Sequence, residues 1–352
     1  MKSIIHERPG VYSSYDASAA VWGGRAVRTI GVAAKSTGGT ANEVVRLTSY
    51  EMGLNAFGED APDTPGMSTI LKLLFLGGAS VAAAVKVEGE DYSAAFAALQ
   101  AVEDAQIIVC DSGELAVQQA LRASLESASA ARRERIAVVG MNGASTAELV
   151  ERAKALNSER MALVGPDGLD RDGRKLPGIF AAAAVAAAIA ITRDPAIPLN
   201  GSSLPGLGGV SETYGDNEID LLVRGGVTPL EAVGGTVSPV RGITTRTVTG
   251  GAADTAWREL TTILIVDDVI PTIRQSLRSR FSQTKNTAQT RGAIRSQTIV
   301  ELENKLRTEI IDSYSDVAVS AYEDDPTVCL VEFSFSVAHG LNQIYLTAHI
   351  TI

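Results

Sequence analysis

The sequence predicts an α/β core with a mostly parallel sheet, preceded by a small mixed subdomain and followed by an α+β domain. One observation is an alternation of short apolar runs with helical patterns over residues 92–164. A second is a helical apolar stripe that begins at Ile263, and a third is a pair of alternating segments after Thr327. These patterns place the parallel sheet in the middle of the chain and a separate group of helices and strands near its end.

Composition indicates a globular protein. A chain of 352 residues is long enough for roughly two domains. The formal charge of −10 argues against a general nucleic-acid binder, because phosphate contacts require a basic face. Cys110 and Cys329 each lie in an apolar, strand-like run, so we expect buried free thiols in a reducing compartment.

No segment has the pattern of an export signal or a membrane span. The opening MKSIIHERPG lacks the apolar stretch and cleavage site of a secretory signal, so we expect the protein to stay in the cytoplasm. Residues 179–191, IFAAAAVAAAIAI, are fewer than the roughly 18 needed to cross a bilayer. They are interpreted as a buried helix that packs closely through its alanines.

The first 90 residues are divided into an arm and a subdomain. Residues 1–22 are expected to be an N-terminal linking arm, because Pro9-Gly10 prevents a continuous helix and core-forming residues are sparse. Residues 23–90 contain the β-like runs VRTIGVAA and SVAAAVKV and an apolar segment, residues 67–76, that predicts a helix. We expect a small mixed β subdomain here.

The α/β core is expected over residues 91–240. Its strands are predicted at residues 105–110, 135–139 and 160–164, and its helices at residues 92–102, 114–133 and 145–156. Such alternation implies right-handed crossovers. After the alanine-rich helix, residues 193–217 form a long Pro/Gly/Ser connection that is interpreted as a functional segment or a contact surface. Residues 219–249 are predicted to form short strands broken by paired glycines.

An α+β domain is expected over residues 241–340, followed by a C-terminal linking strand at residues 341–352. The first helix has an apolar stripe and a kink or new start at Pro271. The second is predicted at residues 298–312, with a capping box at its start. Strands are predicted at residues 329–337 and 344–352. The apolar stripe of the first helix consists of Ile263, Val266, Ile270, Ile273, Leu277 and Phe281. The capping box of the second helix is Thr298 with Glu301. The predicted buried face of the second helix is Ile299, Leu302, Leu306 and Ile310.

Catalytic motifs are absent from the sequence. It has no phosphate-binding GxxxxGK[ST] loop, no GxSxG turn and no HExxH or paired CxxC spacing, so no enzyme activity, catalytic residue, metal or cofactor is predicted. Asp111 follows a predicted strand, where α/β enzymes often place an acid, and Gly140 begins a turn that lacks the full dinucleotide fingerprint. Asp267-Asp268 could bind a cation, cap a helix N-terminus or stabilise a kink. These residues leave open the alternative of a cytoplasmic α/β nucleotide-binding protein or enzyme.

A basic cluster interrupts the acidic background. Between Pro271 and Ser296 there is no Asp or Glu. The cluster consists of Arg274, Arg278, Arg280, Lys285, Arg291 and Arg295. Cations gathered on a helix end and the following loop indicate an anionic partner; the alternative is a solvated face balanced by acids folded nearby.

The two ends of the sequence suggest strand exchange. An extended segment such as residues 342–352 can add to the edge of a neighbour's sheet through main-chain hydrogen bonds. Residues 4–15 are a second candidate. The alternative for the last strand is a place in the sheet of its own chain.

Several of these segments resemble the phage tail sheath family, the contractile outer sleeve of myovirus tails and tail-like bacteriocins. The resemblance is carried in order by PGVY at residues 9–12, RDPAIPLNG at 193–201, VRGITT at 240–245, WRELTTILIVDDVIPTIRQSL at 257–277 and NQIYLTAHITI at 342–352. It covers the chain nearly from end to end. The chain's length is similar to that of compact sheaths without outer decoration domains.

The resemblance implies a structural subunit that stacks as hexameric rings around an inner tube and contracts to drive that tube through a target envelope. The implied partners are further copies of the chain, the inner tail tube protein, and baseplate and tail terminator proteins, with no direct nucleic acid contact and no membrane insertion. The implied location is a virion tail or tail-like particle assembled in the host bacterial cytoplasm. The linking arms carry over to Ile4, Ile5, Val11, Tyr12, Ile344, Tyr345, Leu346 and Ile350. We assign the tube-facing surface to the basic cluster on electrostatic grounds.

Overall fold

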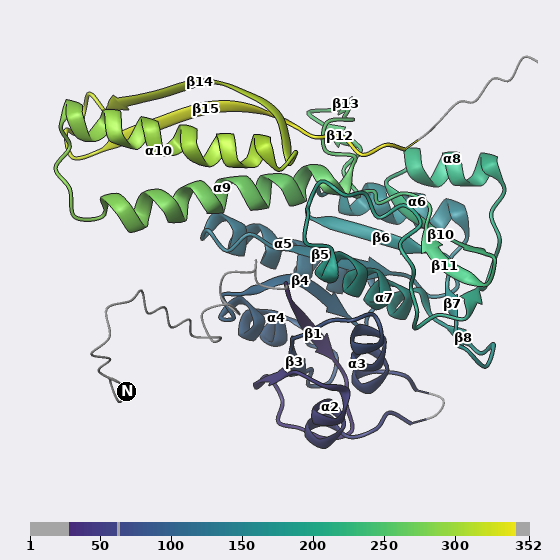
Figure 1. The fold of residues 1–352 in the computed structure, drawn as a ribbon. Coiled ribbons are helices and arrows are strands. Elements are labelled where there is room, and N and C mark those ends of the chain that lie inside the picture. The colour runs from purple at the N-terminus through teal and green to yellow at the C-terminus, as the bar shows by residue number, and fades with distance from the viewer. Residues whose placement is uncertain (1–27, 62–63, 343–352) are drawn as a thin grey trace, which may run out of the picture.

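The computed structural model describes residues 28–61 and 64–342, which are built around one eight-stranded sheet (Figure 1). The strand order is β11-β10-β6-β5-β4-β1-β3-β2. Five neighbouring pairs are parallel, and the antiparallel pairs β2/β3 and β10/β11 lie at the two edges. The strands are β1 Thr29–Ala34, β2 Val44–Leu47, β3 Ala82–Lys86, β4 Ala105–Cys110, β5 Ile136–Gly140, β6 Met161–Gly165, β10 Val227–Val233 and β11 Thr236–Pro239. The predicted α/β protein with a mostly parallel sheet is confirmed.

The central strands are buried on both faces, as continuous apolar runs require. Every residue of β5 and β6 is buried. Successive side chains enter different cores: Val138 packs into one cluster and Val139 into the other. The three strands predicted at residues 105–110, 135–139 and 160–164 therefore lie within one residue of β4, β5 and β6.

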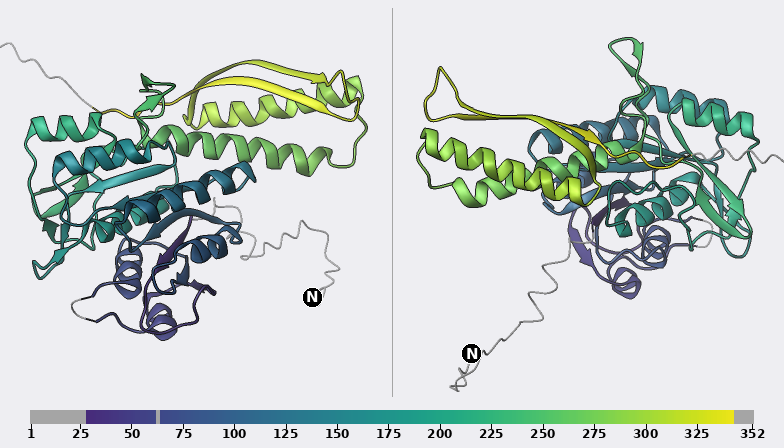
Figure 2. Two further views of the ribbon diagram at one scale, coloured as in Figure 1. Left: turned by 180° about the vertical axis from the view of Figure 1, so that it is seen from behind. Right: turned by 45° about the horizontal axis from the view of Figure 1, so that its top comes forward.

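Helices cover both faces of the sheet and make a three-layered body (Figures 1 and 2). One face packs against α4 Ser93–Gln100, α5 Leu115–Ala130, α6 Thr146–Leu156 and α8 Asp216–Arg224. The other packs against α2 Tyr50–Phe57, α3 Met67–Leu76 and α7 Gly178–Ile191. In α7 every residue except Ile191 is buried, so the alanine-rich run is the packed helix that the sequence predicts. No helix in the described ranges is long and apolar enough to cross a bilayer.

The boundary expected at residue 90 does not divide the sheet. β1 lies between β3 and β4, and it pairs in parallel with both, through Ile30↔Ala82 and Ile30↔Ile107. The strands of residues 29–86 therefore extend the central sheet and do not form a separate small subdomain. The local hydrophobic pattern predicted these strands, but it could not predict that β1 pairs with the distant β4.

The C-terminal region is an elongated layer of two helices and a two-stranded antiparallel sheet (Figure 1). α9 Leu260–Phe281 packs against α10 Ala288–Arg307, and β14 Ile311–Ala321 pairs with β15 Cys329–Val337 over α10. This layer has its own core of Ile265, Val269, Ile273, Leu302, Ile310, Ile311 and Val317. The first turns of α9 bury Leu260, Ile263 and Leu264 in the main core instead. α9 thus belongs to both cores.

Two smaller sheets complete the described chain. β8 Lys175–Leu176, β7 Gly168–Leu169 and β9 Gly209–Val210 form a three-stranded sheet beside the N-terminus of α7. β12 Val248–Thr249 and β13 Ala252–Ala253 form a hairpin between the body and α9.

Two predicted elements are wrong. α10 begins ten residues before Thr298, with Thr287 as its N-cap, and Thr298 is a buried mid-helix residue whose hydroxyl donates to Ile294 O. The end of the same prediction is wrong because Ile311 and Asp312 begin β14. Residues 219–224, predicted as a strand, belong to α8, which starts where the Glu218 carboxylate accepts from Gly215 N at 2.9 Å. α9 continues through Pro271, so the alternative of a new start is wrong, and the kink at Pro271 stays a prediction.

Cys110 and Cys329 are free thiols, as expected. Burial raises the pKa of Cys110 to about 12. Cys329, at the start of β15, is only half-buried, and the expectation of a buried site is wrong for it.

Gly140 ends β5 directly against the first turn of α7. A Cβ at this position would lie 2.2 Å from the Gly178 carbonyl carbon and 2.5 Å from Ile179 N, and these backbone atoms cannot move aside as a side-chain tip can. We expect Gly140→Ala to lower the free energy of unfolding by about 1–3 kcal/mol, measured by denaturant titration. A Cβ on Gly292 in α10 would meet no heavy atom within 4 Å, so Gly292→Ala should stabilise by roughly 0.5–1 kcal/mol. Equal effects of the two substitutions would contradict this packing.

Asp104, just before β4, links this strand to β1 and to the edge strand β2, which β3 separates from β1. It accepts from Thr29 Oγ1 at 2.8 Å and from both Arg46 nitrogens at 2.8 and 2.7 Å, and the hydrogen bond from Arg46 holds its pKa at about 2. Because this folded-state pKa lies below the unfolded value, the stabilisation is complete above about pH 4 and is lost as pH falls through about 2. Both side chains are half exposed, so the effect stays below ~1 kcal/mol. We expect the difference in Tm between the natural chain and Asp104→Asn to shrink over this range; a constant difference would speak against the Arg46 pairing.

Candidate assembly surfaces

Asp111 is a structural hydrogen-bond acceptor at the carboxyl edge of the sheet. It follows β4, and its two oxygens accept from Lys35 N at 2.8 Å and from the Tyr92 hydroxyl at 2.5 Å. Burial raises the pKa of Asp111, which the two hydrogen bonds oppose. Both oxygens thus connect the ends of β1 and β4 to the start of α4, and this geometry gives no support to a catalytic acid.

The turn after Gly140 also serves the protein's own packing. The buried Asp167 carboxylate accepts from Gly143 N at 2.9 Å and from Gly178 N at 2.6 Å, and it pairs with Lys175 Nζ at 2.9 Å. A helix N-terminus favours an anion, and at α7 the anion is Asp167 itself. Glu148 and Glu212 line the adjoining hollow and add further negative charge. The arrangement is therefore unsuited to a nucleotide phosphate.

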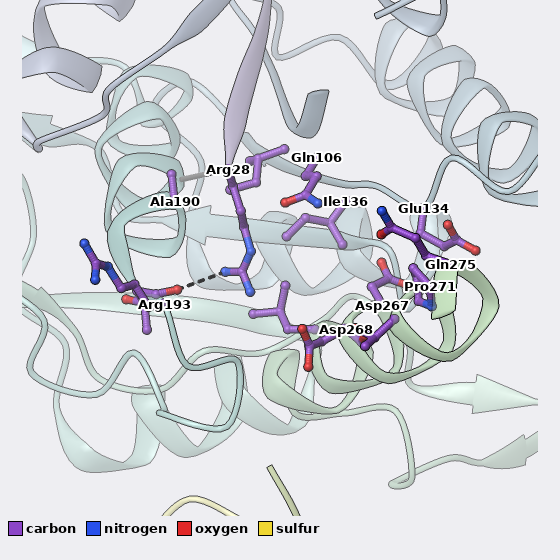
Figure 3. A pocket seen from close by; sticks show the side chains of 14 residues that line it. Arg28, Gln106, Glu134, Ile136, Ala190, Arg193, Asp267, Asp268, Pro271 and Gln275 are labelled. Carbon is purple, nitrogen blue, oxygen red and sulfur yellow. Dashed lines mark hydrogen bonds between the residues drawn. The ribbon is translucent and has the colours of Figure 1, made fainter. Parts of the chain in front are cut away.

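A hollow of about 280 Å³ lies where α9 meets the amino ends of the parallel strands (Figure 3). Gln106 and Ile136 come from the starts of β4 and β5, and Arg28 reaches in to donate to Ile189 O at 2.9 Å and Thr192 O at 3.3 Å. Open α/β sheets bind ligands at the opposite, carboxyl edge. The hollow therefore lies at the contact between the body and α9 of the C-terminal layer, and we call this contact the joint.

Two ion pairs cross this joint. Arg160, just before β6, binds Asp267 of α9 with two hydrogen bonds of 2.8 and 3.1 Å, and both side chains are 13% exposed. Burial raises the pKa of Asp267, and the charge of Arg160 opposes the shift. Arg274 reaches Glu134 at 2.6 Å; burial alone would raise the pKa of Glu134, but the hydrogen bond and charge of Arg274 outweigh it and the pKa is lowered. The apolar first turns of α9 pack into the main core, and the two ion pairs hold the following turns of α9 against the sheet.

The Asp267-Asp268 pair is not an N-cap, and its carboxylates bind cationic side chains of the protein itself. Both residues lie inside α9, where Asp267 pairs with Arg160 and Asp268 with Lys305 of α10. Among the described residues no group of three or more His, Cys, Asp or Glu side chains is placed to hold a metal ion. The two carboxylates thus connect α9 to its two neighbours, the body and α10.

The structure divides the basic cluster into two groups. Arg274 pairs with Glu134, Arg291 donates to Asn286 Oδ1 at 3.0 Å, and Arg295 donates to Val317 O at 2.8 Å. The other three, Arg278, Arg280 and Lys285, are exposed and have no ion pair within the described ranges. We call these three the distal cations; they lie at the far end of α9 and in the loop that follows (Figure 1).

This end of the C-terminal layer is a defined structure with charges of both signs. Asn286 donates to Pro326 O at 2.8 Å and to Val328 O at 3.1 Å, which fastens the α9–α10 loop to the β14–β15 turn. That turn carries three consecutive acids at residues 323–325, of which the first two are exposed and the third is half-buried. The distal cations and the acidic turn therefore lie at the same end of the C-terminal layer, which we call its tip. The charge pattern of residues 271–296 alone does not reveal these acids.

The β14–β15 sheet has two long edges. β15 alternates between half-buried and exposed residues along its whole length, as predicted, with Phe333 and Phe335 facing the smaller core. Within the described part of the chain no third strand pairs with either edge. On the β14 edge, the Val317 carbonyl is occupied by Arg295.

The predicted linking arms lie outside the described residues. This holds for Ile4, Ile5, Val11, Tyr12, Ile344, Tyr345, Leu346 and Ile350. The last described residue, Asn342, is held by a 2.7 Å hydrogen bond from Asn200 Nδ2. Asn200 lies in the 193–217 connection, a part of which therefore contacts the C-terminal segment of the same chain.

Sequence reasoning missed Glu134 and Arg160, and it singled out Arg274 and Asp267 without their partners. Glu134 and Arg160 belong to no motif. The only signal was positional, because Glu134 and Arg160 each stand just before an apolar strand. Nothing in the sequence showed that α9 would supply their partners.

Comparison with known proteins identifies the family. A sequence model of the phage tail sheath protein central domain matches residues 85–245, and one of the phage tail sheath C-terminal domain matches residues 252–351. The tail sheath protein of Bacillus phage SP01 is 30% identical over 224 residues, which are 62% of this chain and 38% of that protein. The chain thus spans well under half of the length of this curated relative.

Solved structures show the same fold. A chain from the helical sheath of the anti-feeding prophage in its contracted state superimposes with a TM-score of 0.72 at 16% identity, covering 98% of this chain and 99% of that one. A sheath tail protein from Desulfitobacterium hafniense gives 0.69 at 11% identity, covering 93% of this chain and 100% of that one. With two domain models that follow one another along most of its length, the chain belongs to the phage tail sheath protein family.

Proposed function

We propose that this protein is the structural subunit of a contractile tail sheath, in which copies stack as hexameric rings around an inner tube and are linked by donated terminal strands. The observation that carries the proposal is the two-stranded β14–β15 sheet, whose long edges have no further strand in the described chain. Family membership supplies the context in which such edges join copies.

Strand donation follows from the geometry of this sheet. Two strands alone are marginally stable, and here the sheet is supported on one face by α10. An added strand would satisfy the outward backbone groups through main-chain hydrogen bonds, while alternate side chains set its register. We propose that residues 4–15 and 343–352 of neighbouring copies supply these strands. Ile344, Leu346 and Ile350 have the even spacing that one face of such a strand requires.

The distal cations are the proposed tube-facing charges. They are exposed and lack ion-pair partners in the described chain, whereas Arg274, Arg291 and Arg295 contribute to the subunit's own fold. An anionic strip on the tube would be attracted to them, and the acidic turn at the same tip would require a precise orientation of that strip. The proposed surface is therefore smaller than the six residues of the sequence prediction.

Contraction would use conformational energy and no chemical reaction at this subunit. A helical array of subunits that contact one another head to tail does not close on itself, and it can be held strained until a baseplate signal releases it. The joint of α9 supports this proposal, because two ion pairs and a shared helix keep body and C-terminal layer together while subunits move. Baseplate and terminator proteins would hold the two ends of the array. The enzyme alternative draws no support from Asp111 or the Gly140 turn, since both are engaged in internal hydrogen bonds.

Deletion of residues 343–352 tests strand donation. The described residues already supply the hydrophobic cores on both faces of the sheet and the C-terminal core, so we expect a folded subunit with unchanged circular dichroism that no longer forms cylinders under negative-stain microscopy. Val233→Ser, at a hairpin residue that is 64% exposed, is the matched control and should still assemble. Cylinders formed by the shortened chain would refute strand donation by this segment.

Reversal of the distal cations tests the tube-facing surface. We expect Arg278→Glu, Arg280→Glu and Lys285→Glu together to weaken co-sedimentation with tubes of the cognate tube protein by roughly tenfold or more at low salt, with a smaller effect at high salt. The control triple is Lys72→Glu, Lys154→Glu and Arg174→Glu, which makes the same change in net charge at exposed positions of the body. If both triples weaken binding equally, overall charge is responsible and the proposed surface is wrong.

A further inference from the structure

The β12–β13 hairpin is an ordered projection that covers none of the described core. Its strands, Val248–Thr249 and Ala252–Ala253, are joined by Gly250 and Gly251 in the left-handed region, with φ of 59° and 84°. All six residues from 248 to 253 are exposed. Figure 2 shows the hairpin extending away from the body in the tilted view. Its order therefore does not come from burying its own side chains.

Polar contacts at the base hold this hairpin in place. Arg246 donates to Thr249 Oγ1 from Nε at 3.0 Å and from Nη2 at 2.9 Å, and it pairs with Glu159 at 2.9 Å. Asp254 accepts from Thr249 Oγ1 as well. Because a two-stranded ribbon is marginally stable in water, these contacts are what pre-organise it. A pre-organised surface loses less conformational entropy when it binds.

The two edges of the hairpin differ. Asp254 N donates to Thr247 O, so Val248 and Ala253 form a non-hydrogen-bonded pair whose backbone N–H and C=O groups point outward. On the β12 edge the Asn157 side chain fills this position: Oδ1 accepts from Val248 N at 3.1 Å and Nδ2 donates to Val248 O at 3.0 Å. On the β13 edge no described residue bonds to the outward groups of Ala253. One edge is closed by an amide, and the other is open.

We propose that the open β13 edge, centred on Ala253, is a contact between copies of this chain, at which an extended segment of a second copy pairs with the Ala253 backbone. Residues 247–253 carry no charge, whereas exposed edges that must stay unpaired are commonly protected by lysine or proline. One of the similar solved chains comes from a helical sheath. In a helical array of identical copies, a surface that contacts a neighbour in one copy makes the same contact in every copy. The proposal rests on the sheath function and adds a contact separate from the terminal arms and the distal cations.

Ala253→Pro tests this edge with little change to the subunit. The Ala253 N–H points away from β12, so proline removes an outward donor and no hydrogen bond of the hairpin. Ala253→Val is the matched control, because it retains the donor and favours a strand. We expect the proline variant to raise the critical concentration for assembly on tubes about fivefold, within the roughly 2- to 12-fold range of one lost hydrogen bond, and the valine variant to leave it unchanged. Thermal unfolding of unassembled protein checks that both variants fold.

Hydrogen exchange on the natural chain gives a second measurement that needs no variant. The peptide containing Ala253 should exchange rapidly in the dispersed subunit and slowly in the assembled sheath. A photo-crosslinker at Thr255 in mixed light and heavy copies should join two copies of this chain. Crosslinking to the tube protein alone, equal exchange in both states, or assembly of the proline variant at the natural concentration would each overturn the proposal. If the natural chain itself forms no sheath, the proposed function fails first; if it assembles and these tests fail, only the edge contact is wrong.

Discussion

One helix shared by two hydrophobic cores determines how the parts of this subunit are arranged. The first turns of α9 are buried with the central sheet, and from Ile265 onward the same helix supplies the smaller C-terminal core. A continuous hydrogen-bonded backbone between the cores resists bending over a span of a few residues. The Arg160–Asp267 and Glu134–Arg274 pairs then fix the helix against the amino edge of the sheet. Removing one partner of the more buried pair would leave a charge with little access to water.

At the opposite, carboxyl edge of the sheet, the polar groups form hydrogen bonds within the subunit. In many α/β proteins the carboxyl edge, with its helix N-termini, binds an anionic ligand. Here Asp167 occupies that position at α7, and the Asp111 oxygens accept from a backbone amide and a tyrosine. The polar groups that could hold a ligand are therefore used for internal packing.

The sequence was sufficient for the central strands and helices, because β5 and β6 are apolar on both faces and α6 has a full Ser145–Glu148 capping box. It was insufficient for α10, since the amphipathic pattern is weak in its first ten residues, where Arg291 and Arg295 lie, and a local Thr298–Glu301 match looked like the start. Pairings between distant residues, such as β1 with β4 or Arg160 with Asp267, leave no local signal. The basic cluster is visible in the sequence as a charged segment, but only the folded structure separates Arg274, with its carboxylate partner, from the exposed distal cations.

The irregular course of β14 has a consequence for any polymer built from this subunit. The ladder with β15 shifts register between Ile311 and Ser313 and again between Ser315 and Ala318, where Asp316 has a φ of 56°, so the eleven-residue β14 bulges against the nine-residue β15. A strand added at the β15 edge would meet a regular backbone, and a strand added at the β14 edge would meet a bulged one. In the proposed polymer, this difference between the two edges would favour one direction of strand addition over the other.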